Sequence, residues 1–336
     1  MKRILFFFAI FVVVVGAVGL GIWNYVNAPY RGDTATWVYV PEGTSRAVLT
    51  DTLRSALGKR VAGSVMAAFK VVASDSIDPH GAYLIQPGDR AKDIARRLVR
   101  RRQTPVRVTF NNIRTREQLA ERISSAMEFS AEEFSDAMSE ILPGSGFKPP
   151  EFLAAFMPDT YEFYWTESPR RVVRKLLEHR NKFWTDKRRT EASALGLTAV
   201  KVAILCSIAE EETNNRSERA TVGRLYLNRL RRGMKLQADP TVKYAVGDFS
   251  IRRILGKHLR VESPYNTYKV AGLPPGPIRM PERQTIEDFL AAPDNNYLYM
   301  CAKEDFSGLH NFSHDFATHQ ANARRYQQAL NARGIK

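Results

Sequence analysis

The chain has 336 residues, enough for two domains or for one domain with accessory segments. Its 50 Lys and Arg residues against 35 Asp and Glu give a formal net charge of +15, which suits nucleic acid, lipid headgroups or an anionic polymer as a partner. The six histidines show no metal-ligand spacing, so the sequence argues against a zinc site, and we expect no cofactor.

The chain begins with an apolar segment. Residues 4–23 carry no charge and are long enough to cross a bilayer as a helix. Lys2 and Arg3 precede them, which predicts a cytoplasmic tail over residues 1–3 and places everything after Asn24 outside the cytoplasm. A signal peptide is the alternative, but its apolar region would be shorter and no small-residue cleavage site precedes Asn24. We therefore predict an uncleaved anchor and expect no nucleic acid as a partner.

Three segments between residues 37 and 146 repeat a strand–turn–helix pattern. Strands are expected over 37–40, 82–85 and 106–110, each followed by a turn and by apolar residues at helical spacing. The second segment is similar to the LysM murein-binding module, since an aromatic strand and a Gly-Asp turn at residues 88–89 precede the helix. A generic βα spacer is the alternative.

The Pro- and Gly-rich stretch 142–150 suits a domain boundary. We expect a membrane-proximal βα region over 37–146 and a helix-rich domain over 151–336. The expected elements of the second domain are a long basic helix over 170–190, helices over 197–212 and 217–232, strands over 297–300 and 309–312, and a closing helix over 315–332. The predicted fold class is α+β: a transmembrane helix, a small LysM-like βα module, and a helix-rich domain with a small sheet.

Two local features of the helix-rich domain add to this picture. Ser217 is expected to cap the helix over 217–232, and Gly233 to end it. Cys206 lies in an apolar helix and suits a small buried hydrophobe. Nothing in the sequence brings it to Cys301, so a disulfide between them is not predicted.

Glu212 is the most informative residue of the chain. Ile204, Ile208 and Glu212 stack along one helical face at i, i+4 and i+8. Its neighbours Glu210 and Glu211 point away from that face and are expected to be solvated. A carboxyl held against apolar neighbours has its ionised form disfavoured, as a general acid near neutral pH requires. If the helix simply ends there, Glu212 turns into water instead.

The loops after this helix carry side chains typical of a carbohydrate cleft. Gln237, Tyr265, Asn266 and Tyr268 lie in segments rich in Pro, Gly and turn residues. Aromatic rings stack on sugar faces, and amide and hydroxyl groups bond sugar hydroxyls. Each of these residues also suits a turn or a core position.

Several segments together resemble the bacterial endolytic murein transglycosylase family. They are residues 157–161, 207–213, 217–219, 228–230, 233–241, 265–268 and 272–278. In that family the catalytic glutamate stands immediately before a threonine, which here is Glu212. The resemblance implies a lytic transglycosylase of the bacterial inner membrane, with its catalytic domain in the periplasm and no cofactor. Its implied partners are peptidoglycan glycan strands, whose stem peptides carry carboxylates, and peptidoglycan synthases, since the family cuts nascent strands and so ends their elongation.

The resemblance also implies a mechanism with one glutamate. Glu212 protonates the oxygen between N-acetylmuramic acid and N-acetylglucosamine, then removes a proton from the 6-hydroxyl as the 1,6-anhydro ring closes. The four polar residues of the loops are expected to orient the substrate. We predict that Glu212→Gln abolishes cleavage without unfolding the protein, and that Glu210→Gln and Glu211→Gln are nearly silent.

Two other functions fit the sequence. Glycoside hydrolysis ordinarily needs a second carboxylate, for which Glu218 and Asp239 are candidates. However, Glu218 suits the first turn of a helix, and Asp239 before a proline suits a turn. The other alternative is a non-catalytic scaffold that binds murein.

Overall fold

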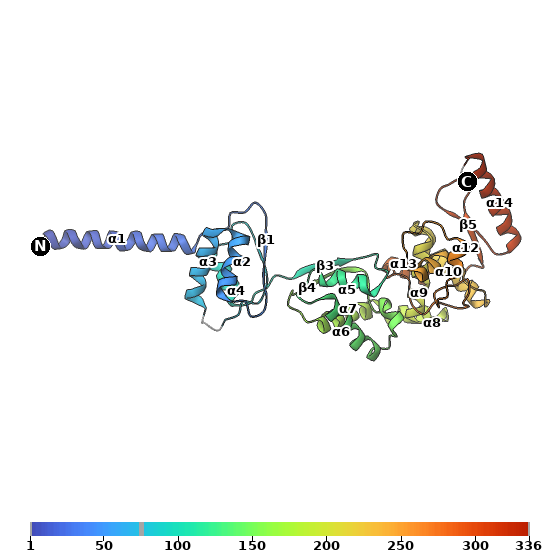
Figure 1. Ribbon diagram of the computed structural model, residues 1–336, viewed down its shortest axis with the longest axis horizontal. Coiled ribbons are helices and arrows are strands. Elements are labelled where there is room, and N and C mark those ends of the chain that lie inside the picture. Colours follow the sequence, from blue (N-terminus) through green and yellow to red (C-terminus); the bar gives the residue numbers. More distant parts are fainter. Residues whose placement is uncertain (1, 74–76, 335–336) are drawn as a thin grey trace. The chain divides into compact units, whose positions relative to one another are not determined.

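Figure 1 shows the computed structural model, which describes residues 2–73 and 77–334. The first residue of the expected cytoplasmic tail and the last two of the expected C-terminal domain lie outside these residues. Helices and three two-stranded sheets alternate along the chain, so the predicted mixture of α and β structure is confirmed. The strands are β1 (Thr36–Val40), β2 (Gly81–Ile85), β3 (Val106–Phe110), β4 (Asp159–Phe163), β5 (Tyr299–Ala302) and β6 (His310–Ser313).

The helices account for most of the described chain. In order they are α1 (Lys2–Val26), α2 (Arg46–Leu57), α3 (Lys59–Val72), α4 (Ala91–Val99), α5 (Arg116–Ser124), α6 (Ala131–Gly144), the 3-10 helix η1 (Pro149–Ala155), α7 (Pro169–Phe183), α8 (Asp186–Ala194), α9 (Ala199–Glu212), α10 (Arg216–Arg231), α11 (Asp239–Val246), α12 (Gly256–Leu259), α13 (Arg283–Ala291) and α14 (Phe316–Ala332).

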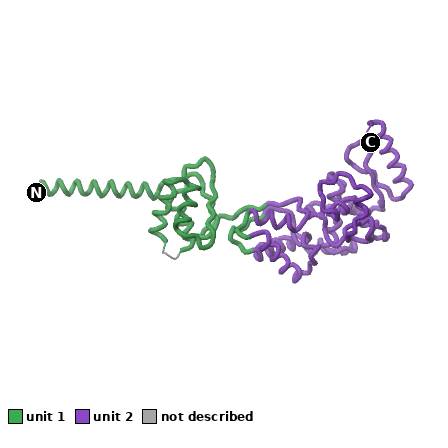
Figure 2. The backbone as a smooth tube through the Cα atoms, viewed as in Figure 1, with its two compact units in different colours: residues 1–108, 126–129, 161–168 green, residues 109–125, 130–160, 169–336 purple. Residues whose placement is uncertain are grey.

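The chain divides into two compact units, which Figure 2 shows in different colours. The first comprises residues 1–108, 126–129 and 161–168, and the second comprises residues 109–125, 130–160 and 169–336. The Pro- and Gly-rich stretch 142–150 spans the end of α6 and the start of η1, inside the second unit.

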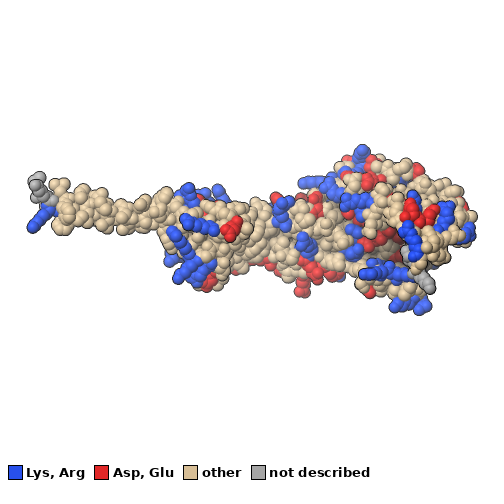
Figure 3. Space-filling model, turned by 90° about the horizontal axis from the view of Figure 1, so that it is seen from above, with Lys and Arg blue, Asp and Glu red and all other residues tan. Residues whose placement is uncertain are grey.

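Helix α1 has the length and composition of a membrane span. Beyond Arg3 it contains no Asp, Glu, Lys or Arg, and its apolar side chains are exposed (Figure 3). A helix whose apolar residues point in every direction is stable only where its whole surface meets an apolar medium or other apolar side chains. The N-terminal apolar helix expected from the sequence is therefore present.

The core of the first unit lies between one face of a sheet and three helices. β1 pairs antiparallel with β2, with Trp37 opposite Leu84. Val38 and Val40 are buried, alternate with half-buried Trp37 and exposed Tyr39, and pack with residues of α2, α3 and α4. The expected strands over 37–40 and 82–85 and their two helices are confirmed. Helix α3 was not predicted; it follows Gly58, whose φ of +81° separates it from α2.

The second unit corrects two sequence-based expectations. The expected helix over 170–190 is two helices, because Trp184 is buried in the core and the Thr185 side chain caps α8. Asn215, not Ser217, is the N-cap of α10: its side chain accepts a hydrogen bond from the Ser217 N–H at 3.0 Å. The predicted C-terminal strands and closing helix are confirmed as β5, β6 and α14, with shifts of one or two residues.

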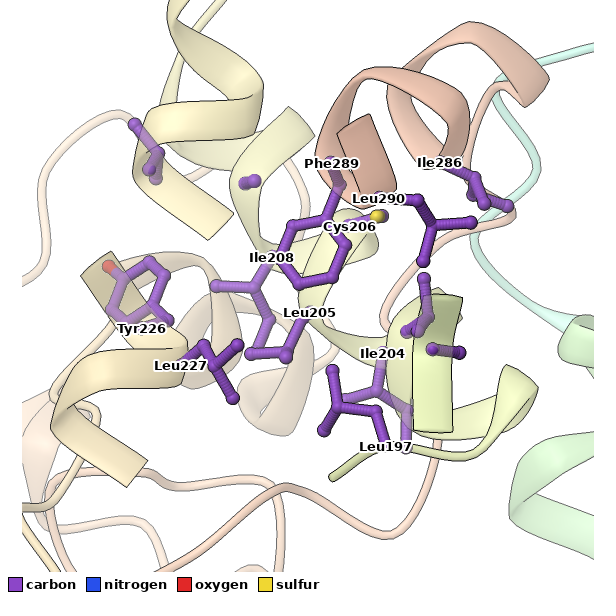
Figure 4. Close-up of a cluster of buried hydrophobic side chains, with 14 of the residues drawn as sticks. Leu197, Ile204, Leu205, Cys206, Ile208, Tyr226, Leu227, Ile286, Phe289 and Leu290 are labelled. Carbon is purple, nitrogen blue, oxygen red and sulfur yellow. The ribbon is translucent and has the colours of Figure 1, made fainter. Parts of the chain in front are cut away.

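The core of the second unit surrounds α9. Residues Val202 to Glu210 are all buried, since α8, α10, α11, α13 and η1 contact this helix. Figure 4 shows the apolar side chains from α9, α10 and α13 that pack together, with Tyr226 at the edge of the cluster. Cys206 is fully buried there, and neither it nor Cys301 forms a disulfide.

Candidate active site

Glu212 is the last residue of α9, where this helix leaves the apolar core. Thr198 caps the start of α9, and the buried face that carries Ile204 and Ile208 leads directly to Glu212. The Glu212 side chain is only partly accessible to solvent. The carboxyl is therefore partly withdrawn from water at the end of a buried helix.

Tyr226 of α10 donates the hydrogen bond that orients this carboxyl. Its hydroxyl lies 2.5 Å from Oε1 of Glu212. Burial raises the pKa of Glu212 to about 7, the Tyr226 hydrogen bond opposes this rise, and the charge of Asp239 adds to it. Burial and the nearby Glu212 charge raise the pKa of Tyr226 well above its usual value, so Tyr226 stays a donor. Glu212 thus changes protonation state near neutral pH, as a group that acts first as acid and then as base requires.

The expectation that Glu210 and Glu211 are solvated is wrong. The carboxylate of Glu210 is buried, accepts a hydrogen bond from the Glu282 N–H at 2.7 Å and pairs with Arg279 at 3.0 Å. Glu211 pairs with Arg279 at 3.1 Å and with Arg114 at 2.9 Å. Every face of α9 between Val202 and Glu210 is covered, and Arg279 and Arg114 from other segments of the second unit meet the glutamates that were expected to face water.

The Pro/Gly loop over 272–278 leads directly into Arg279. Its last residue, Ile278, donates a backbone hydrogen bond to the Ser207 hydroxyl of α9 at 3.1 Å. A Cβ at Gly276 would lie 1.8 Å from the carbonyl oxygen of Pro150. Glycine is therefore required by this close approach, and the loop is held between η1 and α9.

Two adjoining pockets meet at Glu212. The first, the aromatic pocket, has a volume of about 400 Å³ and is named for Tyr299 of β5 and for Phe316 and His319 of α14. The second, the basic pocket, has a volume of about 290 Å³ and contains three cationic side chains. Both are lined by Glu212 and Asp239. The aromatic pocket is further lined by Leu225, Tyr226, Arg229, Leu236, Gln237, Tyr268, Leu298, Tyr299, Met300, Phe316 and His319. The basic pocket is further lined by Glu211, Pro240, Lys243, Ile251, Arg252, Arg253 and Ile254.

Gln237 and Tyr268 are the two predicted binding residues that lie in the aromatic pocket. The Arg229 guanidinium donates to Oε1 of Gln237 at 2.7 Å, which leaves the amide nitrogen of Gln237 as a donor. Gln237 has a φ of +52°, a conformation that non-glycine residues rarely adopt and that is often found at functional sites. The Tyr268 hydroxyl donates to Oδ1 of Asp239 at 2.6 Å.

The other two predicted binding residues lie elsewhere. Tyr265 lines a separate pocket of about 270 Å³ and packs against Tyr244 with ring centroids 4.7 Å apart. Asn266 is fully buried: its Nδ2 donates to the carbonyls of Leu259 and Val261, both at 2.9 Å. Its Oδ1 accepts from the Tyr268 N–H at 3.1 Å, so Asn266 braces the loop that carries Tyr268.

The two candidates for a second carboxylate are also separated. Glu218 accepts hydrogen bonds from the backbone N–H of His310 at 2.8 Å and contacts its ring at 3.0 Å, which ties α10 to β6. It lines neither pocket beside Glu212. Asp239 lines both, and its hydrogen bond from Tyr268 goes beyond the turn role expected from sequence.

Sequence reasoning missed the partner of Glu212 and one wall of the aromatic pocket. Tyr226 lies 14 residues from Glu212 on the next helix, and no motif connects the two. Tyr299 and His319 stack with ring centroids 5.3 Å apart, and Phe316 beside them is 56% exposed. Burial and the Arg229 charge lower the pKa of His319. These residues lie far from Glu212 along the chain, and no local pattern connects them with it.

Among residues 2–73 and 77–334, no group of three or more His, Cys, Asp or Glu side chains is placed to hold a metal ion.

The chain is similar to proteins that carry the name endolytic murein transglycosylase. That of Bacillus subtilis (strain 168) is 32% identical over 174 residues, which cover 52% of this chain and 48% of the relative. That of Streptococcus pneumoniae (strain D39) is 31% identical over 110 residues, 32% of this chain and 20% of the relative. The chain therefore spans about half or less of the length of the curated relatives it matches.

A solved structure and a family match extend over more of the chain. The crystal structure of a YceG-like protein from Listeria monocytogenes is similar over 86% of this chain and 99% of that one, with a TM-score of 0.57 and 24% identity, which supports the fold. Residues 38–325 match the YceG-like family. Because this match includes both compact units and most of the sequence, the chain belongs to the YceG-like family.

Proposed function

We propose that the protein is an endolytic murein transglycosylase. It cleaves the bond between N-acetylmuramic acid and N-acetylglucosamine within peptidoglycan strands and leaves 1,6-anhydro ends. One observation carries the proposal: at the junction of two pockets lies a carboxyl that accepts a hydrogen bond from Tyr226 and whose pKa burial raises to about 7. The names of the curated relatives support the substrate and the reaction.

In the proposed mechanism Glu212 acts twice. Protonated Glu212 gives its proton to the glycosidic oxygen as the bond to the anomeric carbon of N-acetylmuramic acid breaks. Its carboxylate then takes the proton of the 6-hydroxyl, whose oxygen bonds to the anomeric carbon and closes the anhydro ring. Glu212 ends the reaction protonated, as it began. No water is consumed, because the 6-hydroxyl supplies the oxygen that attacks the anomeric carbon. Tyr226 stabilises the carboxylate between the two steps, because its hydrogen bond favours the ionised form.

The lining of the aromatic pocket supports sugar binding. Tyr299, Phe316 and His319 offer ring faces for stacking, and the Gln237 amide offers a donor oriented by Arg229. We assign Gln237 and Tyr268 to direct substrate contact. Asn266 acts through the loop that it braces, and Tyr265 contacts glycan only if the strand extends into its separate pocket.

Cleavage within strands requires that the glycan continue on both sides of the catalytic group. Glu212 and Asp239 line both the aromatic and the basic pocket. A strand that occupies both pockets passes Glu212 with sugars on either side, which supports an endolytic cut.

The membrane-proximal part is proposed to anchor the enzyme and to bind murein. We assign residues 1–3 to the cytoplasm, 4–23 to the inner membrane, 37–146 to a region with a LysM-like module and 151–336 to the periplasmic catalytic domain. A pocket of about 550 Å³ on the first unit supports glycan binding, since Trp37 and Tyr39 stack there with ring centroids 5.7 Å apart. The anchor keeps cleavage near the membrane, where it ends elongation of nascent strands and brings peptidoglycan synthases within reach.

A murein hydrolase is the second candidate, and the position of Asp239 favours it over a non-catalytic scaffold. The charge of Asp239 acts on Glu212, as expected for a nearby second carboxylate. In a hydrolase water attacks the sugar, whereas in a transglycosylase the 6-hydroxyl does.

Mass spectrometry of murein fragments distinguishes these candidates. Full-length protein in detergent is incubated with purified glycan strands, with the Glu212→Gln variant as control. Internal fragments with 1,6-anhydro ends, absent from the control, are the expected result. Fragments one water heavier identify a hydrolase, and folded protein that releases no fragments is a binding scaffold.

A further inference from the structure

The basic pocket beside Glu212 differs chemically from the aromatic pocket. Lys243, Arg252 and Arg253 line it together with two half-buried isoleucines, Ile251 and Ile254. We propose that this pocket is a subsite for the stem peptides of murein, in which the three cations bind peptide carboxylates. The inference rests on the proposed function and extends it. It states that stem peptides attached to the part of the strand on one side of Glu212 bind in this pocket.

The loop that carries the two arginines is attached to the core at its base. The Arg114 guanidinium carbon lies 5.3 Å from the centroid of the Phe249 ring. The centroids of the Phe249 and Tyr244 rings are 6.1 Å apart. The Asp248 carboxylate accepts hydrogen bonds from the Ser250 N–H at 2.9 Å and from its hydroxyl at 2.5 Å. Arg252 and Arg253 lie two and three residues after Ser250, so the segment that carries them starts from a hydrogen-bonded turn.

The arginines of this loop are available for an anion. Arg252 and Arg253 are exposed, and within the described residues neither has a hydrogen bond or ion pair. Lys243 lies in the last turn of α11 and contributes a third positive charge. This charge also acts on Asp248, where it helps to lower the pKa of the carboxyl. An arginine fork pairs well with carboxylates, and its bonds to them are charge-assisted.

The acidic groups of the same pocket are already engaged. Glu211 is paired with Arg114 and Arg279, Asp239 accepts from Tyr268, and Glu212 accepts from Tyr226. They therefore neutralise the three cations only in part. In the aromatic pocket the arginine is already engaged: Arg229 donates to Gln237 and to the carbonyls of Lys235 and Leu298. An anionic peptide is thus favoured in the basic pocket.

Two substrates that differ only in peptide charge test this assignment. One is murein glycan with uncrosslinked stem peptides, and the other is the same material after its carboxylates are converted to amides. We expect the full-length enzyme in detergent to have a kcat/KM about tenfold or more higher for the charged strands, since one charge-assisted bond contributes about 1.4 kcal/mol or more. The preference should shrink as salt rises.

The double variant Arg252→Gln/Arg253→Gln should lose this preference and cleave both substrates at the rate that the unmodified enzyme shows for amidated strands. The control is Arg174→Gln/Arg232→Gln, which removes two exposed arginines that line neither pocket. It should retain the full preference. An unmodified enzyme that cleaves charged and amidated strands equally would overturn the assignment and leave the proposed activity intact.

Binding separates failure of this inference from failure of the proposed function. Calorimetric titration of the Glu212→Gln variant with both strands measures peptide recognition without cleavage. Tighter binding of charged strands, lost when Arg252→Gln/Arg253→Gln is added, supports the subsite even if the enzyme proves to be a hydrolase or a scaffold. Equal binding of charged and amidated strands would refute it in all three cases.

Discussion

The hydrogen bond between Tyr226 and Glu212 makes a quantitative prediction about pH. Glu212 must be protonated to begin the reaction, so activity should fall as pH rises through its pKa of about 7. The Tyr226 hydroxyl, 2.5 Å away, stabilises the ionised form and holds that pKa down. Tyr226→Phe removes this donor and should therefore move the alkaline limb of the pH profile upward.

The size of the shift follows from the strength of the bond. A hydrogen bond to a charged group contributes about 1.5–3 kcal/mol, and one pKa unit corresponds to about 1.4 kcal/mol. Because the protonated carboxyl also accepts a bond from the hydroxyl, only part of this energy separates the two states. We expect a rise of about one pH unit, accompanied by loss of activity where the carboxylate must act as base.

The assay is kcat/KM for glycan strands between pH 5 and 9, which reports the free enzyme. Asp239→Asn is the matched variant of opposite sign: removal of its charge should move the same limb downward. Tyr164→Phe, at an exposed position in the first unit, should leave the profile unchanged. A limb that stays in place in Tyr226→Phe, or that moves the same way in both active-site variants, would refute this account of Glu212.

Three further substitutions test the site and its support. Glu212→Gln should abolish cleavage. It should also raise the free energy of unfolding at pH 8, by at most about 3 kcal/mol. The reason is that the folded-state pKa of Glu212 is about 7 against a usual 4.5, so its ionisation above neutral pH destabilises the folded protein. Urea unfolding at pH 8 and pH 4.5 checks the sign, since the gain should vanish at the lower pH. Glu210→Gln, predicted from sequence to be nearly silent, should instead destabilise the protein by about 1–3 kcal/mol, because it breaks the buried pair with Arg279. The loss is limited because Arg279 keeps its pair with Glu211 and because burial already raises the pKa of Glu210. Glu191→Gln at a surface pair should change stability by less than about 1 kcal/mol. A silent Glu210→Gln would show that this pair is not needed. Gly276→Ala should lower both the melting temperature and cleavage because its Cβ meets Pro150. Gly144→Ala, at the last residue of α6 with no atom within 4 Å, should change stability by less than about 1 kcal/mol. Equal effects of the two substitutions would contradict the close approach at Gly276.

The elements with strong periodicity were predictable from the sequence. The apolar run before Asn24, the alternating residues of β1 and the closing helix α14 all occur near their expected positions. Each depends on side chains within a few residues of one another, so local spacing is sufficient to predict it. The break between α7 and α8 was missed because it depends on where Trp184 becomes buried.

Sequence alone determined which helical face carries Glu212, because the phase of a helix follows from spacing within a few turns. Tertiary structure decided what meets each face. Tyr226 reaches Glu212 from the next helix, and the arginine that buries Glu210 comes from the segment after the Pro/Gly loop. The aromatic wall of the pocket comes from β5 and α14, near the end of the chain. Periodicity encodes where a side chain points, whereas its partner depends on packing between distant segments, and that packing raises the pKa of Glu212 and makes the site.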